Sequence, residues 1–216
     1  MDSSRLSERH KMVQEQLEKR GIQNPWVLQA MLDIPRHFFV PDSQHMKAYD
    51  DGPLPIGQEQ TISQPYIVAA MIEAIDPEPS KRVLEVGVGS GYSVTVLRRI
   101  VQEVYGIERN PVLLAEAKKR IERLGLGQVN LKEGDGTLGW PEAAPFDAIL
   151  VTAGSPRVPE ALLRQLKEGG VLLIPLGNRE EQKLLRIVKN PGGRLQEKEL
   201  FPVRFVPLIG ADGWPQ

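Results

Sequence analysis

The chain of 216 residues contains no cysteine and only three histidines, His10, His37 and His45. The lack of cysteine excludes disulfide bonds, thiolate catalysis and zinc–sulfur sites. The histidines form no H-x-x-x-H pair, the spacing that places two zinc ligands on one face of a helix. We therefore expect a protein without a metal site.

Long apolar segments and an excess of one charge are missing as well. No apolar run approaches the roughly 20 residues that a membrane-spanning helix needs, and the first residues are charged, unlike a secretory signal. Lys and Arg number 27 and Asp and Glu number 28, a formal net charge of -1. Such a balance provides no bulk attraction to nucleic acid or to an anionic membrane. We expect a cytoplasmic protein with neither as a partner.

Residues 82–92 read RVLEVGVGSGY, a short apolar run that breaks into three glycines spaced by two. The apolar run is typical of a strand buried on both faces. A helical pattern follows, so the glycine turn ends at a helix N-terminus, where free N–H groups collect. A glycine run of this kind is also common as a simple tight turn, but its place after a buried strand is the usual ligand position in a doubly wound sheet.

The glycine spacing indicates the class of ligand. A dinucleotide fingerprint needs G-x-G-x-x-G, and Tyr92 stands where a count from Gly87 requires the third glycine. A P-loop is excluded because no G-K-[ST] follows. Glu85 precedes the first glycine by two residues, and a carboxylate there repels a pyrophosphate but suits an ammonium or sulfonium group. The pattern E-x-G-x-G-x-G resembles motif I of the S-adenosylmethionine-dependent methyltransferases.

Strands and helices alternate from residue 81 onward. We expect strands over 82–86, 103–108, 129–133, 146–152 and 171–175, helices over 92–101, 111–124 and 159–166, and two final strands over 183–189 and 197–206. No helix fits between the last two strands, so they should pair antiparallel. The sequence therefore predicts an α/β fold with a doubly wound, Rossmann-like methyltransferase sheet, mostly parallel with an antiparallel C-terminal edge.

Residues 1–80 are expected to form an N-terminal part that packs on the core, residues 81–216, in a single compact unit. Helices are predicted over 6–20, 26–32 and 66–75. The proline-rich stretch 34–65 lacks periodicity but carries aromatic and aliphatic residues, so we expect a functional loop rather than disorder. It ends beside Ser63, which lies near the start of the third helix, and capping that helix is the plain structural role for this residue.

Acidic residues and glycine follow the second and third core strands. Glu108 ends the second strand, where a carboxylate can accept hydrogen bonds from both hydroxyls of a ribose. Asp135 follows the third strand, where it can accept from an adenine amino group while Gly136 lets the backbone approach the ring. Each residue alone is also typical of an ordinary strand end or turn. Together they indicate a nucleoside site, because the carboxyl ends of parallel strands meet at one edge of a sheet.

Several segments outside the glycine motif resemble the protein-L-isoaspartate O-methyltransferase family. They are 34–41 (IPRHFFVP), 48–57 (AYDDGPLPIG), 60–65 (QTISQP), 134–136 (GDG), 146–153 (FDAILVTA), 166–170 (LKEGG) and 203–208 (VRFVPL). The resemblance runs from about residue 5 to 210, and the T-I-S-x-P segment is specific to this family. Members often have glycine before the Q-T-I-S run, whereas this chain has Glu59, which leaves the local loop conformation open.

The family transfers a methyl group from S-adenosylmethionine to the side-chain carboxylate of L-isoaspartyl residues in damaged proteins and peptides. The product is S-adenosylhomocysteine, and the methyl ester re-forms a succinimide that returns some chains to aspartate. The resemblance implies that Ser63 is the catalytic residue, and we expect the enzyme to be a monomer. It implies cofactor contacts at Thr61, Ile62, Glu85, Gly87, Gly89, Ser90, Gly91, Glu108, Arg109, Asp135 and Gly136. It implies substrate contacts at Ser63, Ile56, Val206 and Leu208.

Two other functions stay open on the residues alone. Another small-molecule or RNA methyltransferase would use the same core, although the balanced charge argues against RNA. A non-catalytic nucleotide-binding module would keep the glycine motif but would not depend on Ser63.

Overall fold

The computed structural model describes residues 5–125 and 127–215, and within them a seven-stranded sheet forms the centre of the molecule. Its spatial order is β5-β4-β3-β6-β7-β8-β9. The strands are β3 (Arg82–Val86), β4 (Glu103–Glu108), β5 (Asn130–Glu133), β6 (Phe146–Val151), β7 (Leu166–Gly177), β8 (Gln182–Lys189) and β9 (Leu195–Val203). The first five are parallel, and β8 and β9 add antiparallel at the edge. The predicted fold class, with its antiparallel C-terminal edge, is confirmed.

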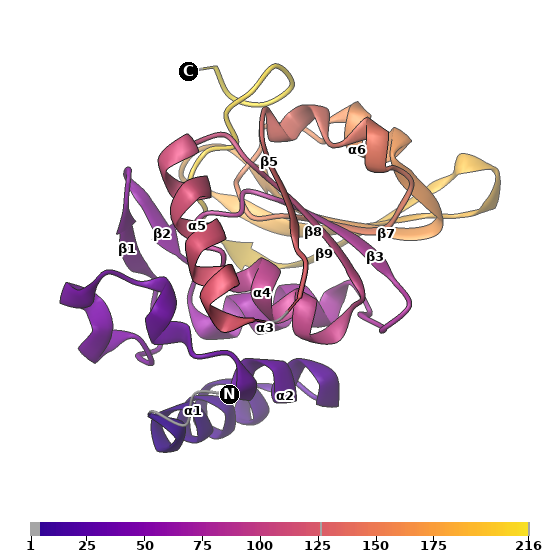
Figure 1. Ribbon diagram of the computed structural model, residues 1–216. Coiled ribbons are helices and arrows are strands. Elements are labelled where there is room, and N and C mark those ends of the chain that lie inside the picture. The colour runs from indigo at the N-terminus through magenta and orange to yellow at the C-terminus, as the bar shows by residue number, and fades with distance from the viewer. Residues whose placement is uncertain (1–4, 126, 216) are drawn as a thin grey trace.

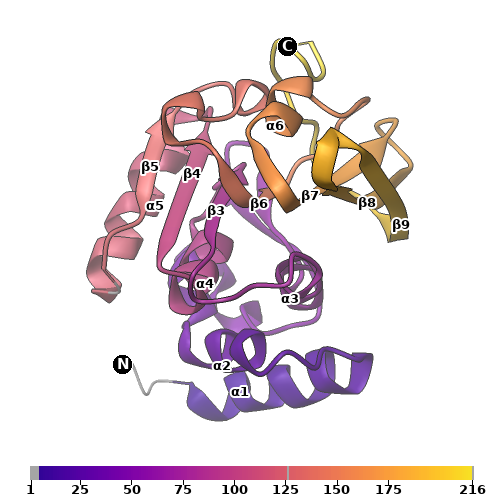
Figure 2. The same cartoon turned by 90° about the vertical axis from the view of Figure 1, so that its right-hand side faces the viewer.

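Helices cover both faces of this sheet. They are α3 (Pro65–Ala74), α4 (Tyr92–Ile100), α5 (Pro111–Leu124) and α6 (Glu160–Arg164). Because successive strand residues point to opposite faces, Val83 packs in one apolar cluster with α3, α4 and α5, while Leu84 packs in a second cluster with α6. Figure 2 shows α6 on one side of the sheet and α3 and α4 on the other.

Two N-terminal helices form a further layer on the outer side of α3 and α4 (Figure 1). The first begins as α1 (Leu6–Met12), continues through a π turn and a 3₁₀ turn to Arg20, and ends at Gly21 with φ 94°. The second is α2 (Pro25–Asp33), whose first turn is capped by the Asn24 side chain. Among residues 5–125 and 127–215, no helix has the length and apolar character needed to cross a membrane.

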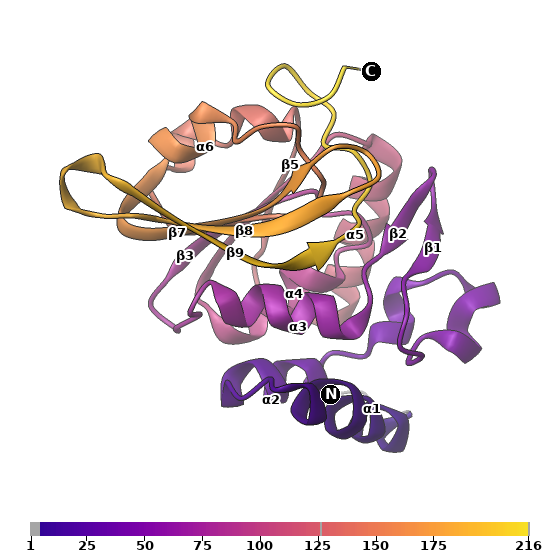
Figure 3. The same ribbon diagram turned by 180° about the vertical axis from the view of Figure 1, so that it is seen from behind.

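The stretch 34–65, expected as an aperiodic loop, contains a β-hairpin. Its strands are β1 (Leu54–Gly57) and β2 (Gln60–Ile62), which pair with each other and not with the main sheet. Figure 3 shows the hairpin at the end of the molecule toward which β9 points. The turn residues Gln58 and Glu59 have φ of 53° and 56°. This left-handed conformation favours glycine, so the turn, whose conformation the sequence left open, holds Glu59 in a backbone geometry that suits glycine better.

Three of the predicted core elements differ from the prediction by two residues or more at one end or both. β7 spans Leu166–Gly177 rather than 171–175, because the glycines at its start conceal the apolar pattern of a strand. α6 is shorter than the predicted 159–166 and covers Glu160–Arg164. β9 ends at Val203 rather than at residue 206, since the chain leaves the sheet there and crosses toward the carboxyl ends of the parallel strands.

Candidate active site

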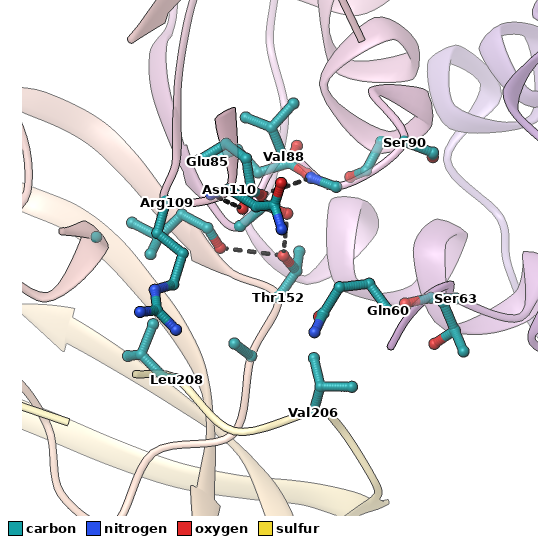
Figure 4. Close-up of a pocket in the computed structure, with 18 of the residues that line it drawn as sticks. Gln60, Ser63, Glu85, Val88, Ser90, Arg109, Asn110, Thr152, Val206 and Leu208 are labelled. Carbon is teal, nitrogen blue, oxygen red and sulfur yellow. Dashed lines mark hydrogen bonds between the residues drawn. The ribbon is translucent and has the colours of Figure 1, made fainter. Parts of the chain in front are cut away.

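A cavity of about 530 Å³ opens at the carboxyl ends of β3, β4 and β6. The glycine loop after β3 and the residues after β4 form one part of its wall. The hairpin β1–β2, the start of α3 and residues 206–209 form the rest. In Figure 4, Gln60 and Ser63 lie on one side of the cavity, Arg109 and Leu208 on the other, and Thr152 between them.

The glycine loop, which follows β3, packs closely against Thr152, the residue directly after β6. Gly87 has φ 97°, and a Cβ built on it would lie 2.6 Å from the Oγ1 atom of Thr152. That hydroxyl donates to the carbonyl oxygens of Val86 and Gly87 over 3.0 and 2.7 Å. A side chain at position 87 would therefore break the contact between the two strand ends and narrow the cavity.

Glu85 brings a buried carboxyl group to the cavity wall. The residue is 1% exposed, and its Oε2 atom has no hydrogen-bond partner among the described residues. Burial raises the pKa of Glu85 to about 8, a hydrogen bond with Ser93 works against this shift, and the nearby charge of Glu108 adds to it. An unpartnered buried carboxyl oxygen is costly, and a cationic donor entering the cavity would satisfy it.

Glu108 ties the end of β4 to the glycine loop. Its Oε2 atom accepts a hydrogen bond from the backbone N–H of Gly89, and its Oε1 atom accepts one from the backbone N–H of Asn110, each over 2.9 Å. Each carboxylate oxygen keeps a free lone pair for a further donor. Arg109 is exposed beside it and, among the residues that the structure describes, has no hydrogen-bond or ion-pair partner.

Ser63 lies in the cavity wall between β2 and α3. The N-cap position of α3 is Gln64, with Pro65 in the first turn, so the expected capping role does not fall to Ser63. Within residues 5–125 and 127–215, the Ser63 hydroxyl forms no hydrogen bond. The Gln64 side chain instead donates to the Asp51 carboxylate over 2.7 Å, which holds the start of α3 against the preceding loop. The Ser63 hydroxyl is thus available to a ligand.

The structure brings most of the predicted site residues to this cavity. Those in its wall are Thr61, Ile62, Ser63, Glu85, Gly87, Gly89, Ser90, Glu108, Arg109, Gly136, Val206 and Leu208. Three others lie behind the wall. Ile56 supports the glycine loop from β1, Gly91 forms the N-cap of α4, and the Asp135 carboxylate accepts hydrogen bonds from Thr137 and Ala211.

Other lining residues went unpredicted. They are Gln58, Glu59, Gln60, Val68, Met71, Val86, Val88, Tyr92, Ser93, Ile107, Asn110, Pro111, Leu150, Thr152, Ala153, Pro207 and Ile209. Asn110-Pro111 was detectable, because this pair is the helix-start signal of α5 and directly follows Glu108. The hairpin residues carried no comparable signal. In the part of the chain that the structure describes, no group of three or more acidic or histidine side chains is arranged to hold a metal ion.

Comparison with known proteins agrees with this geometry. The family model "Protein-L-isoaspartate(D-aspartate) O-methyltransferase (PCMT)" matches residues 7–213. The chain is 54% identical over 213 residues to the protein-L-isoaspartate O-methyltransferase of Pelotomaculum thermopropionicum, covering 99% of this chain and 93% of that relative. It is 51% identical over 216 residues to protein-L-isoaspartate O-methyltransferase 2 of Marinobacter nauticus, covering 99% of both.

Two solved structures share the fold. One, a protein-L-isoaspartate O-methyltransferase, superposes with a TM-score of 0.86 at 34% identity, over 95% of this chain and 67% of that chain. The other is a putative protein-L-isoaspartate O-methyltransferase from Plasmodium falciparum in complex with S-adenosyl-L-homocysteine. It superposes with a TM-score of 0.80 at 28% identity, over 93% of this chain and 98% of that chain.

Proposed function

Because this chain belongs to the protein-L-isoaspartate(D-aspartate) O-methyltransferase family, we infer that it is a protein repair enzyme. It transfers a methyl group from S-adenosylmethionine to the side-chain carboxylate of L-isoaspartyl residues in damaged proteins and peptides. The ester then closes to a succinimide, which opens in part to normal aspartate. The observation that carries this function is the family match over residues 7–213, which includes both the glycine loop and Ser63.

The cavity fits S-adenosylmethionine through its polar groups. The unpartnered Oε2 atom of Glu85 suits the ammonium group of the cofactor, and the free lone pairs of Glu108 suit its ribose hydroxyls. Gly136 is buried in the cavity wall, where a Cβ would lie 2.3 Å from the Val86 side chain, so only glycine fits at this proposed adenine contact. The remaining proposed cofactor contacts are Thr61, Ile62, Gly87, Gly89, Ser90, Gly91, Arg109 and Asp135. When bound, S-adenosylmethionine supplies an electrophilic methyl group on a positively charged sulfur.

Ser63 is our proposed catalytic residue. The isoaspartyl carboxylate is already ionised at neutral pH, so no general base is needed. The Ser63 hydroxyl can donate a hydrogen bond to one carboxylate oxygen and hold the group in line with the methyl carbon. The N-terminus of α3 adds a favourable potential for the anion. Alignment of two reactants can contribute up to roughly 7–11 kcal/mol to catalysis.

The substrate is proposed to lie against the segment that follows β9. Val206 and Leu208 line the cavity, and Ile56, in strand β1 of the hairpin, packs against the glycine loop. The carbonyl of Val206 accepts from the N–H of Gly154, and the N–H of Leu208 donates to the carbonyl of Gly154, each over 2.8 Å. An extended peptide can pair with the opposite edge of this segment, as in strand addition. Recognition through the backbone would accept many flanking sequences.

We further propose a cytoplasmic monomer that acts on isoaspartyl proteins and peptides and not on nucleic acid. The formal net charge of -1 supports the last point. In this proposal, residues 1–80 supply the hairpin with Thr61, Ile62 and Ser63, and residues 81–216 supply the other cofactor contacts and the substrate contacts Val206 and Leu208. Both parts share one apolar core cluster, which supports a single compact unit.

The test offers labelled S-adenosylmethionine with an isoaspartyl peptide and its normal aspartyl twin. We expect label only in the isoaspartyl peptide, and equal or absent labelling of the two would contradict the function. Ser63→Ala should lower kcat by about 10- to 100-fold, the effect of one hydrogen bond to a charged group, while cofactor affinity stays unchanged. Ser63→Thr retains a hydroxyl and should keep more activity, and Ser43→Ala on the exposed surface is the matched control.

A further inference from the structure

The segment 204–214 after β9, here called the C-terminal strap, has little regular structure of its own. Its central residues, Val206 to Ile209, line the active-site cavity. Isolated bridges to Gly154 and within the strap are its β contacts among the described residues. The position of such a segment depends on the contacts that fix its two ends.

Gln182, the first residue of β8, holds the beginning of the strap. Its side chain is 3% exposed and bonds both backbone groups of Phe205, the residue directly before Val206. The Oε1 atom accepts from the N–H of Phe205 over 2.8 Å, and the Nε2 atom donates to the carbonyl of Phe205 over 3.1 Å and to that of Asn178 over 3.3 Å. The buried amide of Gln182 thus makes the two backbone hydrogen bonds with Phe205 that a neighbouring strand would otherwise make.

The fit around Gln182 is close. A Cβ on Gly154 would lie 2.4 Å from the Nε2 atom of Gln182, so the amide packs directly on the Gly154 backbone. Gly154 is also the residue that bonds Val206 and Leu208. Displacement of the Gln182 amide would therefore shift Gly154 and, through its hydrogen bonds, Val206 and Leu208 in the cavity wall.

Asp135 holds the far end of the strap. Its Oδ2 atom accepts from the N–H of Ala211 over 2.7 Å, and its Oδ1 atom accepts from the N–H and hydroxyl of Thr137 over 2.9 and 2.7 Å. The Thr137 hydroxyl in turn accepts from the N–H of Asp212 over 3.1 Å. A Cβ on Gly210 would lie 2.0 Å from Asp135 Oδ1, so the strap backbone rests on this carboxylate.

We propose that Gln182 and Asp135 are positioning residues for the isoaspartyl substrate, because they clamp the two ends of the strap that forms the substrate wall. The inference rests on the proposed function, which takes Val206 and Leu208 as substrate contacts. Neither clamp residue lines the cavity, so each acts through the strap. This role is separate from the proposed contact between Asp135 and the adenine of the cofactor. Loss of that contact would weaken cofactor binding.

The decisive variant is Gln182→Glu, which is titratable. A protonated glutamic acid keeps one donor and one acceptor and can replace the amide, whereas the ionised form has no donor for the Phe205 carbonyl. Relative to the unchanged protein at the same pH and at saturating cofactor, KM for the isoaspartyl peptide should rise about tenfold or more at high pH. It should return toward the normal value at low pH. Gln196→Glu, on the exposed surface of β9, is the matched control.

Two further measurements separate the possible causes. Asp135→Asn keeps only one acceptor oxygen, so it can no longer accept from both Thr137 and Ala211, and it should raise the peptide KM measured at saturating S-adenosylmethionine, whatever its effect on the Kd of S-adenosylhomocysteine. Hydrogen exchange at the amides of Phe205 and Ala211 should accelerate in the respective variants, a readout that does not depend on activity. A KM ratio for Gln182→Glu that does not change with pH would overturn the proposal. A raised cofactor Kd with unchanged KM in Asp135→Asn would also overturn it, whereas failure of the unchanged protein to methylate any isoaspartyl peptide would refute the function itself.

Discussion

Cofactor binding should depend on pH through Glu85. Burial raises the pKa of this carboxyl to about 8, so at pH 7 the group is mostly protonated in the free protein. Pairing with an ammonium group requires the ionised form, and binding must therefore release a proton. The affinity should rise as pH rises toward 8 and level off above it.

The size of the effect follows from the pKa. At pH 7, one unit below this pKa, the free energy needed to ionise Glu85 lowers the cofactor affinity about tenfold, or by about 1.4 kcal/mol. At pH 6 it lowers the affinity about a hundredfold. Kd should thus fall about tenfold per pH unit between 6 and 8. Above pH 8, Glu85→Gln should weaken binding by about 10- to 100-fold, because it removes a charge-assisted hydrogen bond.

Calorimetry with S-adenosylhomocysteine tests this, because the product keeps the ammonium group and does not react. Titrations from pH 6 to 9 give Kd, and titrations at pH 7 in buffers of different ionisation enthalpy give the number of protons released, which we expect to be close to one. The ammonium group of the ligand titrates equally in both proteins, so the difference in slope between the unchanged protein and Glu85→Gln isolates the carboxyl. Equal slopes in the two proteins would refute the assignment of Glu85 to the ammonium.

Three other substitutions test a cofactor contact, a helix cap and the turn of the hairpin. Glu108→Ala removes the acceptor for Gly89 and Asn110 and should raise the Kd of S-adenosylhomocysteine at least tenfold; unchanged affinity would make Glu108 a mere strand-end residue. Asn24→Ala removes the cap of α2 and should lower the free energy of unfolding in urea by about 1 kcal/mol with unchanged kcat. Glu59→Gly relieves a left-handed φ of 56° and should leave stability unchanged or raise it by up to about 1 kcal/mol; a clear loss in urea unfolding would show that the Glu59 side chain stabilises the turn.

The elements whose bounds were predicted correctly are marked by residues at their own ends in the sequence. β4 and α5 have the predicted bounds, because Asn110 and Pro111 mark the start of the helix and Gly125, with φ 60°, marks its end. The hairpin was missed because its strands of four and three residues are too short to show a period. Their pairing depends on two left-handed turn residues that are not glycine.

The candidate site shows the same division. The glycine loop was found because its spacing and its place after a buried strand are both visible in the chain. The bond between Asp135 and Ala211 joins residues 76 positions apart, and the bond between Gln182 and Phe205 joins residues 23 positions apart. No local pattern predicts such pairs, and both maintain the part of the site assigned to the substrate.

The two halves of the site also differ in what holds them in place. The glycine loop is fixed by parallel strands whose register continues to Val86 and Ile107, and by the bonds of Glu108. The hairpin and the strap lie outside the main sheet and depend on single side chains. Gln64, bonded to Asp51, joins the two segments that flank the hairpin, and Gln182 bonds Phe205 of the strap. Segments held by few contacts open at lower free energy than a central sheet. We therefore expect the proposed substrate wall to adapt to different flanking sequences while the proposed cofactor site keeps its geometry. Such a division would suit an enzyme whose targets share one damaged residue and little else.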